Sequence, residues 1–418
     1  MKTRRLCLAT LAGSVALLIA GGAAACSGRD DAGSTPTVVP SSPASPTPLA
    51  TPTAAATPLP TVGAGELRAI AVEVATARVV RLPVGLNSLG RRTAWSRNSS
   101  WVAVAGDEGL AVGTVGSPSF LRFASGKCFD VEWSPVADLL AAVCAQRLAV
   151  FDKDGRLVAE AAVSQADFTA KQPTVHWAPD GQVLAYGPLG RTVKVLRLAG
   201  TEAEVKGAFT DFQWAAGGYL VTFEEPRLQP PSTVRLHDPA RGFAAIAEYT
   251  TPERSTAVGV DPTGTYVAYG VYGAERGPGE RVLSSTFYIV RLGDAAVVAT
   301  FESAYGTDYN RTSFAPDGSA ALMMTDYCRP ETWTLDIGSI DGTKRTLARG
   351  GAMALKFSPD GRWVGYTKGI ELWVVRSDGA EPPRKLADDI HGPAGFEWSP
   401  DSRWISVPPF FGGFDQCP

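Results

Sequence analysis

Trp177-Ala178-Pro179-Asp180-Gly181 is a stretch of five residues that recurs along the chain with few changes. An aromatic residue is followed by a small residue, proline, aspartate and glycine, and then by two variable residues and an apolar run. Proline pre-sets φ for the first turn position, and aspartate can bond back to the backbone. Glycine takes the left-handed position of a three-residue hairpin with a bulge. The stretch therefore predicts the end of one strand, a tight turn and the start of the next strand.

Eight copies of this stretch can be found, and we name the first residue of each copy its anchor. The anchors are Trp95, Trp133, Trp177, Trp214, Val260, Phe314, Phe357 and Trp398. The copies at Trp95, Trp133 and Trp214 are degraded, and those at Val260 and Trp398 differ slightly. The spacings are 38, 44, 37, 46, 54, 43 and 41 residues, which is the size of one four-stranded propeller blade.

Each repeat also contains a second pair of strands. In the second repeat, residues 147–152 and 156–163 alternate in polarity around the turn Lys153-Asp154-Gly155. The sixth and seventh repeats have the same order around Asp341-Gly342 and Asp378-Gly379. Such runs predict strands joined by tight hairpins, and no segment after residue 64 has a helical period. We expect four strands per repeat, lettered A to D in chain order, and an all-β fold.

This repeat resembles the TolB-type and related WD-like propeller repeats, over essentially all of residues 64–418. The resemblance implies a β-propeller. It is specific for the fold and weak for function, because such propellers have many roles.

The two ends of the repeat region predict how the ring closes. Trp398 is followed by only about twenty residues, which supply strands A and B (396–400 and 404–407). Two strand-like runs, 67–74 and 78–82, precede the first anchor and would complete the last blade as its strands C and D. This arrangement predicts eight blades. Seven blades are the alternative if the weak copy at Trp214 belongs to another blade.

Residues 1–26 have the features of an export signal. Lys2, Arg4 and Arg5 precede an apolar run, and small residues lead to Cys26. The stretch from Ala23 to Cys26 resembles a bacterial lipobox, which implies a lipoprotein whose Cys26 carries the lipid, such as palmitate. Ordinary cleavage at an A-x-A site is the alternative.

Residues 27–63 are predicted to be a disordered linker rich in Pro, Thr, Ser and Ala. No charged residue occurs between Ala32 and Gly65, and prolines recur throughout. Such a composition cannot bury enough apolar surface to offset its ordering entropy. The linker is expected to hold an extracytoplasmic domain, residues 64–418, away from the cell membrane to which Cys26 anchors it.

Four cysteines remain after the signal and the lipid site, and export permits disulfides. If Ser134 and Asp138 pair across the hairpin, facing residues have numbers that sum to 272, which places Cys128 opposite Cys144. Cys328 and Cys417 would then form a second disulfide, because both are expected on the same face of the ring.

Strong catalytic signatures are missing from the sequence. There is no G-x-S-x-G, H-E-x-x-H, Walker or dinucleotide pattern, and only three histidines occur. Asp152-Lys153-Asp154-Gly155 lacks the further ligands of a calcium loop, so a turn is favoured. We therefore predict no catalytic residue, cofactor or metal site. With a net charge of −3 and no basic block after the first residues, a nucleic-acid partner is not expected.

Polar residues directly before the anchors are expected to line the central tunnel. They are Glu132, His176, Gln213, Lys356 and Glu397. Hydrogen bonds and ion pairs between adjacent blades are the favoured interpretation, and a small-ligand or ion site is the alternative.

The connections B–C and D–A should leave the ring opposite the short Pro-Asp-Gly turns. They include long loops, where binding residues usually lie. The candidate binding face consists of Tyr327, Arg329, Asp388, Asp389 and His391. These features favour a non-enzymatic scaffold or sensor at the cell envelope that binds a protein or a cell-wall polymer. The alternatives are a carbohydrate-active or other hydrolase or lyase, and a small-ligand or metal binder that uses the tunnel.

Overall fold

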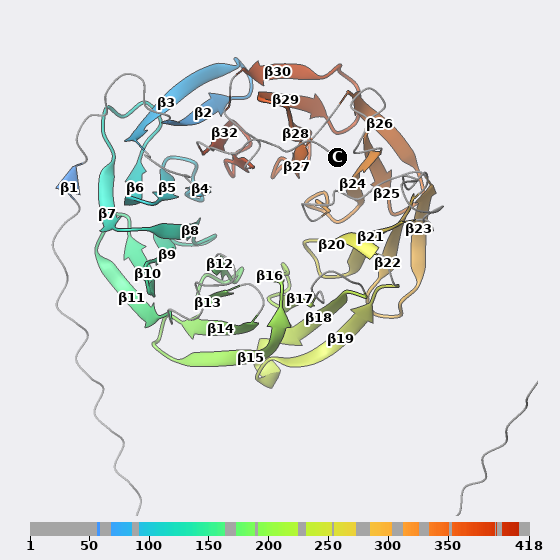
Figure 1. Ribbon diagram of the computed structural model, residues 1–418, viewed down its shortest axis with the longest axis horizontal. Coiled ribbons are helices and arrows are strands. Elements are labelled where there is room, and N and C mark those ends of the chain that lie inside the picture. The colour runs from blue at the N-terminus through green and yellow to red at the C-terminus, as the bar shows by residue number, and fades with distance from the viewer. Residues whose placement is uncertain are drawn as a thin grey trace, which may run out of the picture. The chain divides into compact units, whose positions relative to one another are not determined.

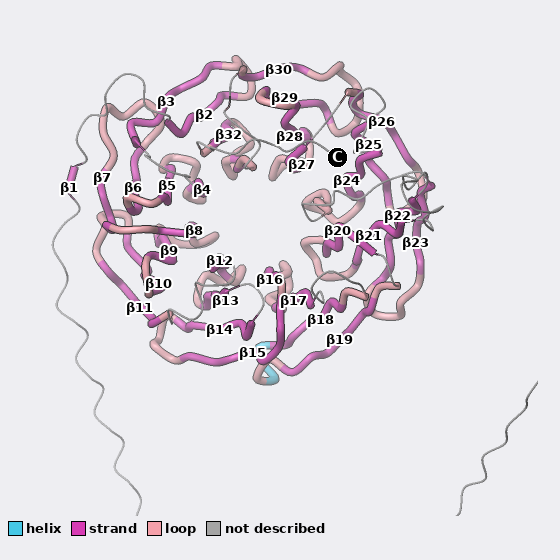
Figure 2. The backbone as a smooth tube through the Cα atoms, in the orientation of Figure 1, coloured by secondary structure: helices cyan, strands magenta, loops and turns pink. Residues whose placement is uncertain are grey.

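Eight blades are arranged around a central channel in the computed structural model (Figure 1). The model describes residues 57–58, 68–85, 92–163, 173–188, 191–224, 231–252, 255–272, 285–302, 312–325, 334–350, 353–388, 390 and 395–408. In these residues helical structure is limited to the three-residue 3-10 helix Pro239–Arg241, and nothing there is a helix long and apolar enough to cross a membrane (Figure 2). The predicted all-β, WD-like propeller is confirmed.

The first four blades follow one another along the chain. Blade 1 has β4 (Arg92–Trp95), β5 (Val102–Gly106), β6 (Gly109–Gly113) and β7 (Leu121–Ser125). Blade 2 has β8 (Cys128–Trp133), β9 (Leu139–Cys144), β10 (Arg147–Asp152) and β11 (Leu157–Ala162). Blade 3 has β12 (Pro173–Trp177), β13 (Val183–Pro188), β14 (Arg191–Arg197) and β15 (Glu202–Phe209). Blade 4 has β16 (Asp211–Trp214), β17 (Leu220–Glu224), β18 (Thr233–Asp238) and β19 (Ala244–Thr250), so the copy at Trp214 builds its own blade and the seven-bladed alternative is wrong.

The next three blades repeat this order. Blade 5 has β20 (Ser255–Val260), β21 (Tyr266–Tyr272), β22 (Ser285–Arg291) and β23 (Val297–Glu302). Blade 6 has β24 (Ala320–Thr325), β25 (Thr334–Ser339) and β26 (Lys344–Arg349), and in the described residues before β24 the bridge Phe314↔Ala321 stands at the position of strand A. Blade 7 has β27 (Met353–Phe357), β28 (Trp363–Lys368), β29 (Glu371–Arg376) and β30 (Arg384–Ala387).

Blade 8 closes the ring with strands from both ends of the repeat region. The order is β3 (Arg78–Gly85), β2 (Arg68–Glu73), β32 (Trp404–Val407) and β31 (Glu397–Trp398). Strands β2 and β32 are antiparallel, with Ile70 opposite Val407. Figure 1 shows blue β2 and β3 beside red β32. The predicted closure is confirmed. Within the predicted linker, Thr57–Pro58 (β1) pairs with the outer strand β7 of blade 1.

The recurring turn is held by its own side chains. In blade 7, Ser358 Oγ donates to Asp360 Oδ1 at 2.6 Å and accepts from the amide of Trp363 at 2.9 Å. Asp360 Oδ1 also accepts from the amide of Arg362 at 3.1 Å. Gly361 has a φ of +69°, the left-handed conformation predicted for this position. These local bonds explain why the short stretch specifies a turn without help from the rest of the chain.

Blades pack on one another through apolar seams. Each core cluster joins side chains of two adjacent blades, such as Leu322 and Ile337 of blade 6 with Phe357 and Val364 of blade 7. The middle strands are buried on both faces, as in β9, whereas the outer strand β11 alternates between exposed and partly buried residues. The core of this ring therefore lies between the blades.

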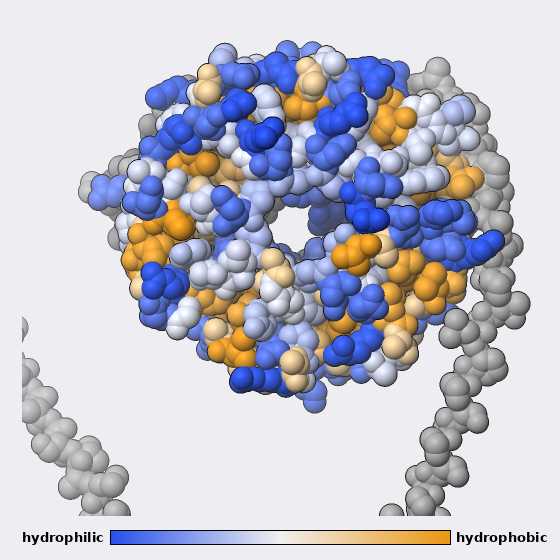
Figure 3. All heavy atoms as spheres, turned by 180° about the vertical axis from the view of Figure 1, so that it is seen from behind, coloured by the Kyte–Doolittle hydropathy of each residue, from blue (hydrophilic) through white to orange (hydrophobic). Residues whose placement is uncertain are grey.

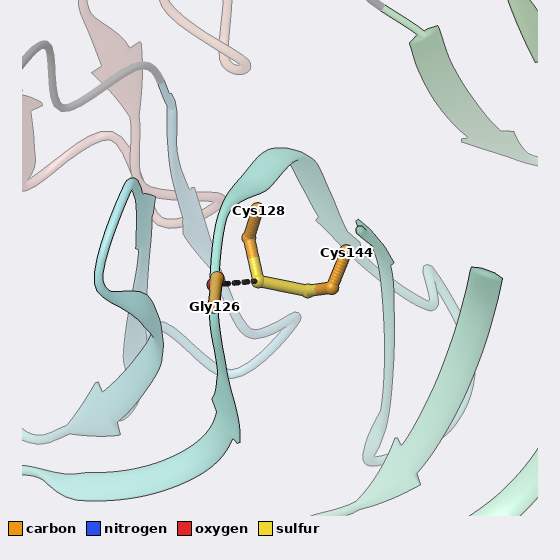
Figure 4. Close-up of a disulfide and its surroundings, with 3 residues drawn as sticks. All are labelled: Gly126, Cys128 and Cys144. Carbon is orange, nitrogen blue, oxygen red and sulfur yellow. Dashed lines mark hydrogen bonds between the residues drawn. A yellow bond between two sulfur atoms is a disulfide. The ribbon is translucent and has the colours of Figure 1, made fainter. Parts of the chain in front are cut away.

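Cys128 and Cys144 form the predicted disulfide at one end of blade 2 (Figure 4). The predicted register is wrong for the rest of the hairpin, because Ser134 donates its amide to Leu139 O and Trp133 faces Leu140. The register shifts between Cys128 and Asp130, and this bulge brings the two cysteines opposite each other. Cys328 and Cys417 lie outside the described residues.

Candidate functional site

The central channel is the place where the inner strands of all blades converge. Figure 3 views the ring from behind and shows the open channel at its axis. The residues before the anchors lie on these inner strands, as expected. His176 Nδ1 lies 3.1 Å from Glu132 Oε2, and Lys356 Nζ lies 2.6 Å from Glu397 Oε2. Gln213 Nε2 donates to Val260 O at 3.1 Å, so all five residues make the predicted contacts between adjacent blades.

His176 and Glu132 form a coupled pair on the channel wall. Their side chains are 35% and 36% exposed. Burial lowers the pKa of His176, but the carboxylates of Glu132, Asp130 and Asp211 outweigh it and raise that pKa to about 9. His176 therefore carries a positive charge at neutral pH and links blade 3 to blade 2 as an ion pair.

A second polar layer lies three residues before the anchors. It was not predicted from the sequence. It consists of Arg92, Asp130, Thr174 and Asp211. Arg92 Nε lies 3.5 Å from Asp130 Oδ1, and this carboxylate raises the pKa of Arg92. Alternate residues of a strand share a face, so polar residues one and three positions before an anchor were the available signal. Blades 2 to 4 contribute residues to both layers, and blade 1 adds Arg92 to the second layer.

Asp130 also connects its blade to the next one. Its Oδ2 accepts from the amide of Val175 in blade 3 at 3.0 Å. Thr174 is 7% exposed, and its hydroxyl has no hydrogen-bond partner within the described part of the chain. The pairs around Glu132, Lys356 and Asp130 therefore join adjacent blades, whereas the hydroxyl of Thr174 does not.

Tryptophan anchors join blades at the same level of the channel. In four of the five, the indole Nε1 donates to the carbonyl of the channel residue in the preceding blade. The bonds are Trp95 to Glu397 O at 3.3 Å, Trp177 to Glu132 O at 3.0 Å, Trp214 to His176 O at 3.0 Å and Trp398 to Lys356 O at 3.3 Å. Trp133 Nε1 is buried without a partner among the residues described, and there the Arg92–Asp130 pair links blades 1 and 2.

The predicted binding face is described only in part. Asp388 follows the outer strand β30, is 71% exposed in its side chain and lies 2.7 Å from Lys385 Nζ. Tyr327, Arg329, Asp389 and His391 lie outside the described residues, as does Cys26. Of the five face residues, the structure therefore describes Asp388 alone.

The described residues contain no cluster of metal ligands. Within the described ranges, His, Cys, Asp and Glu side chains form no group of three that could hold a metal ion. Asp152 Oδ1 accepts from the amides of Asp154 and Arg156, each at 2.9 Å, so this carboxylate supports the C–D turn of blade 2.

Comparison with known proteins identifies the fold. No family model matches the chain, and no curated protein matches it. Among solved structures, the Dos1 propeller is similar with a TM-score of 0.55 and 10% identity, covering 80% of this chain and 96% of that one. A chain of the mitotic checkpoint complex has a TM-score of 0.48 and 17% identity, covering 70% and 86%. At 10% identity, the likeness to the Dos1 propeller shows the propeller fold alone.

Proposed function

We propose that the chain is an exported, lipid-anchored scaffold or sensor that binds a protein partner at the cell envelope. One observation carries the proposal: three charged pairs of the channel are engaged in contacts between blades. The pairs His176–Glu132, Lys356–Glu397 and Arg92–Asp130 use groups that a catalytic centre would need free. A rigid ring with long connections on one face is well suited to binding.

The envelope location is proposed from the sequence of the first 63 residues. The lipobox-like stretch ending at Cys26 supports a lipid anchor, and the Pro- and Thr-rich segment supports a stalk. Acyl labelling tests this part directly. We expect labelled palmitate to be incorporated into the full chain and the Cys26→Ser variant to lose both the label and membrane association. Equal membrane association of the two chains would overturn the anchor.

Partner binding is tested separately by pull-down from detergent-solubilised native membranes, using the full chain with its lipid site. We expect a stoichiometric protein partner whose cross-links map to the face of the B–C and D–A connections. Cross-links confined to the Pro-Asp-Gly turns would place the binding surface on the opposite face. A sample without any partner would contradict the scaffold proposal.

A small-ligand site in the channel is the second candidate function. It is favoured by the buried Thr174 hydroxyl, which lies beside the charged layer of Arg92, Asp130 and Asp211. Under this proposal, Thr174→Val would abolish binding of the ligand while leaving the protein-partner complex intact.

A further inference from the structure

A pocket opens between blades 6 and 7, on the face that carries the A–B and C–D turns. Its volume is about 360 Å³, within the range of small-molecule sites. Ala320, Ile337 and Phe357 supply apolar lining, and Pro316 and Pro359 of two successive Pro-Asp-Gly turns also line it. The pocket lies at a seam whose anchor is Phe357, where no indole reaches across to the preceding blade.

Besides Ser319, Ser339, Ser377 and Arg345, the polar part of the pocket contains three carboxylates. They are Asp317 and Asp360, from equivalent positions of the two turns, and Asp378 from the C–D turn of blade 7. Asp378 is already paired with Arg376, whose Nε donates to its Oδ1 at 3.2 Å. Hydrogen bonds from the Ser319 side chain and amide lower the pKa of Asp317, which is therefore ionised at neutral pH.

Asp317 and Asp360 are only weakly compensated by positive charge, although Arg345 itself lines the pocket. Arg345 donates to the backbone, from Nη1 to Asp378 O at 2.9 Å and from Nη2 to Ser377 O at 2.8 Å. Arg362 Nε lies 4.0 Å from Asp360 Oδ2 on a side chain that is 75% exposed. The pocket thus combines an apolar lining with two carboxylates that have no cation closer than 4.0 Å within the described part of the chain, a combination that attracts a positive group with an apolar stem.

We propose that this pocket binds an organic cation, an alkylguanidinium or alkylammonium group with an apolar stem. The apolar lining would contact the stem, and Asp317 and Asp360 would accept hydrogen bonds from the cationic head. The cation could be a free amine or an arginine or lysine side chain of another protein. The site is distinct from the channel and does not depend on the envelope function proposed above.

Titration of the full chain with n-butylguanidinium and n-butylammonium, followed at the Ile337 δ1 methyl group by NMR, tests this proposal. Ile337 lines the pocket, and Ile405 in blade 8 serves as a distant reference. We expect saturable shifts at Ile337, none at Ile405, and none at either with pentanoate, which has a stem of similar length and the opposite charge. Absence of a saturable shift at Ile337, or an equal one with pentanoate, would overturn the site.

The variant pair for this test is matched by turn position. Asp317→Asn with Asp360→Asn should weaken binding about fivefold, the size expected for loss of exposed ion pairs. Asp180→Asn with Asp401→Asn is the control, because Asp180 and Asp401 accept the same turn amides at 2.9 and 3.1 Å but lie in other blades. Equal weakening by both double variants would show a general turn effect and contradict the proposal.

The two sources of the cation are distinguished with an acetylated, amidated Gly-Arg-Gly peptide. Tighter binding of the peptide than of n-butylguanidinium would identify a protein side chain as the ligand. Tighter binding of the free cation would identify a small amine or guanidine. Either result supports the site, and failure of both probes refutes it without bearing on the membrane anchor or on the partner pull-down.

Discussion

Blades 8 and 1 to 4 begin their recurring turn at tryptophan, whereas blades 5 to 7 begin it at valine or phenylalanine. Both groups form the same left-handed turn, as Gly181 and Gly361 show with φ of +64° and +69°. The difference lies between the blades, because four of the five tryptophans donate to the preceding blade across the channel wall. The turn therefore specifies the blade. The side chain of the anchor determines whether an indole hydrogen bond joins that blade to the preceding one.

The second half of the ring joins its blades by other means. Gln213 donates to Val260 O, and Arg345 reaches two carbonyls of the next blade. A Cβ added to Gly318 would lie 2.7 Å from Asp261 Oδ2, so these two turns pack closely. Where neither an indole nor such close packing is present, between blades 6 and 7, a pocket remains.

The largest effect is expected at blade 2, the exception among the tryptophan blades. Replacing Cys128 and Cys144 by alanine removes a cross-link over 16 positions and should lower the free energy of unfolding by about 3 kcal/mol. Urea denaturation under oxidising conditions measures this. A loss below about 1 kcal/mol would show that the bulge holds without the disulfide. A further loss when this variant is reduced would indicate the predicted Cys328–Cys417 bond.

Two matched tryptophan variants test the comparison itself. Trp177→Phe removes an indole that donates at 3.0 Å and should cost about 2 kcal/mol of unfolding free energy. Trp133→Phe removes an indole N–H without a described partner and should cost about 1 kcal/mol less. Denaturation curves of the two variants give the difference directly. Equal losses would mean that ring size, and not the hydrogen bond, explains the role of the anchor.

The substitution Phe357→Trp gives blade 7 the tryptophan anchor that blades 8 and 1 to 4 have. The indole should reach toward the Ser313 carbonyl, as Trp398 reaches Lys356 O, and should raise the unfolding free energy by about 1 kcal/mol. It should also fill the pocket and abolish the Ile337 shift with n-butylguanidinium. Lower stability, measured in the same urea titration, would reveal that this seam is too tight for an indole.

The smallest expected effect is the pH dependence of the His176–Glu132 pair. The folded-state pKa of His176, about 9, lies above the ordinary value of 6.5, so the pair stabilises the fold fully below pH 6.5 and loses this effect as the pH rises through 9. Because the side chain is 35% exposed, solvent screening limits the change to about 1 kcal/mol. His176→Gln should flatten the profile of urea midpoints between pH 6.5 and 9. An unchanged slope would assign the pH dependence to other groups.

Local patterns predicted most of the architecture. The repeat around Trp177 and the runs at 67–74 and 404–407 were sufficient for eight blades and their closure, because each strand and turn is encoded by nearby residues. The bulge beside Cys128 was not predictable, since it changes the register inside one hairpin without a sequence signal. The Trp133 indole without a described partner was not predictable either, since it depends on how blade 2 packs against blade 1. The pocket was not predicted because its lining comes from two different repeats, blades 6 and 7. Its shape depends on how these two blades pack around Phe357.

The closing blade has a consequence for the order of events in folding. Arg403 and Glu73 pair across blade 8 although they are 330 positions apart in sequence. During synthesis, the edge of β2 that pairs with β32 stays unpaired until almost every other blade has been synthesised. Pairing over such a separation is slow, and unpaired strand edges are prone to aggregate. An unfinished chain would therefore be the form most in need of a chaperone, and completion of β32 would be the step that ends that need.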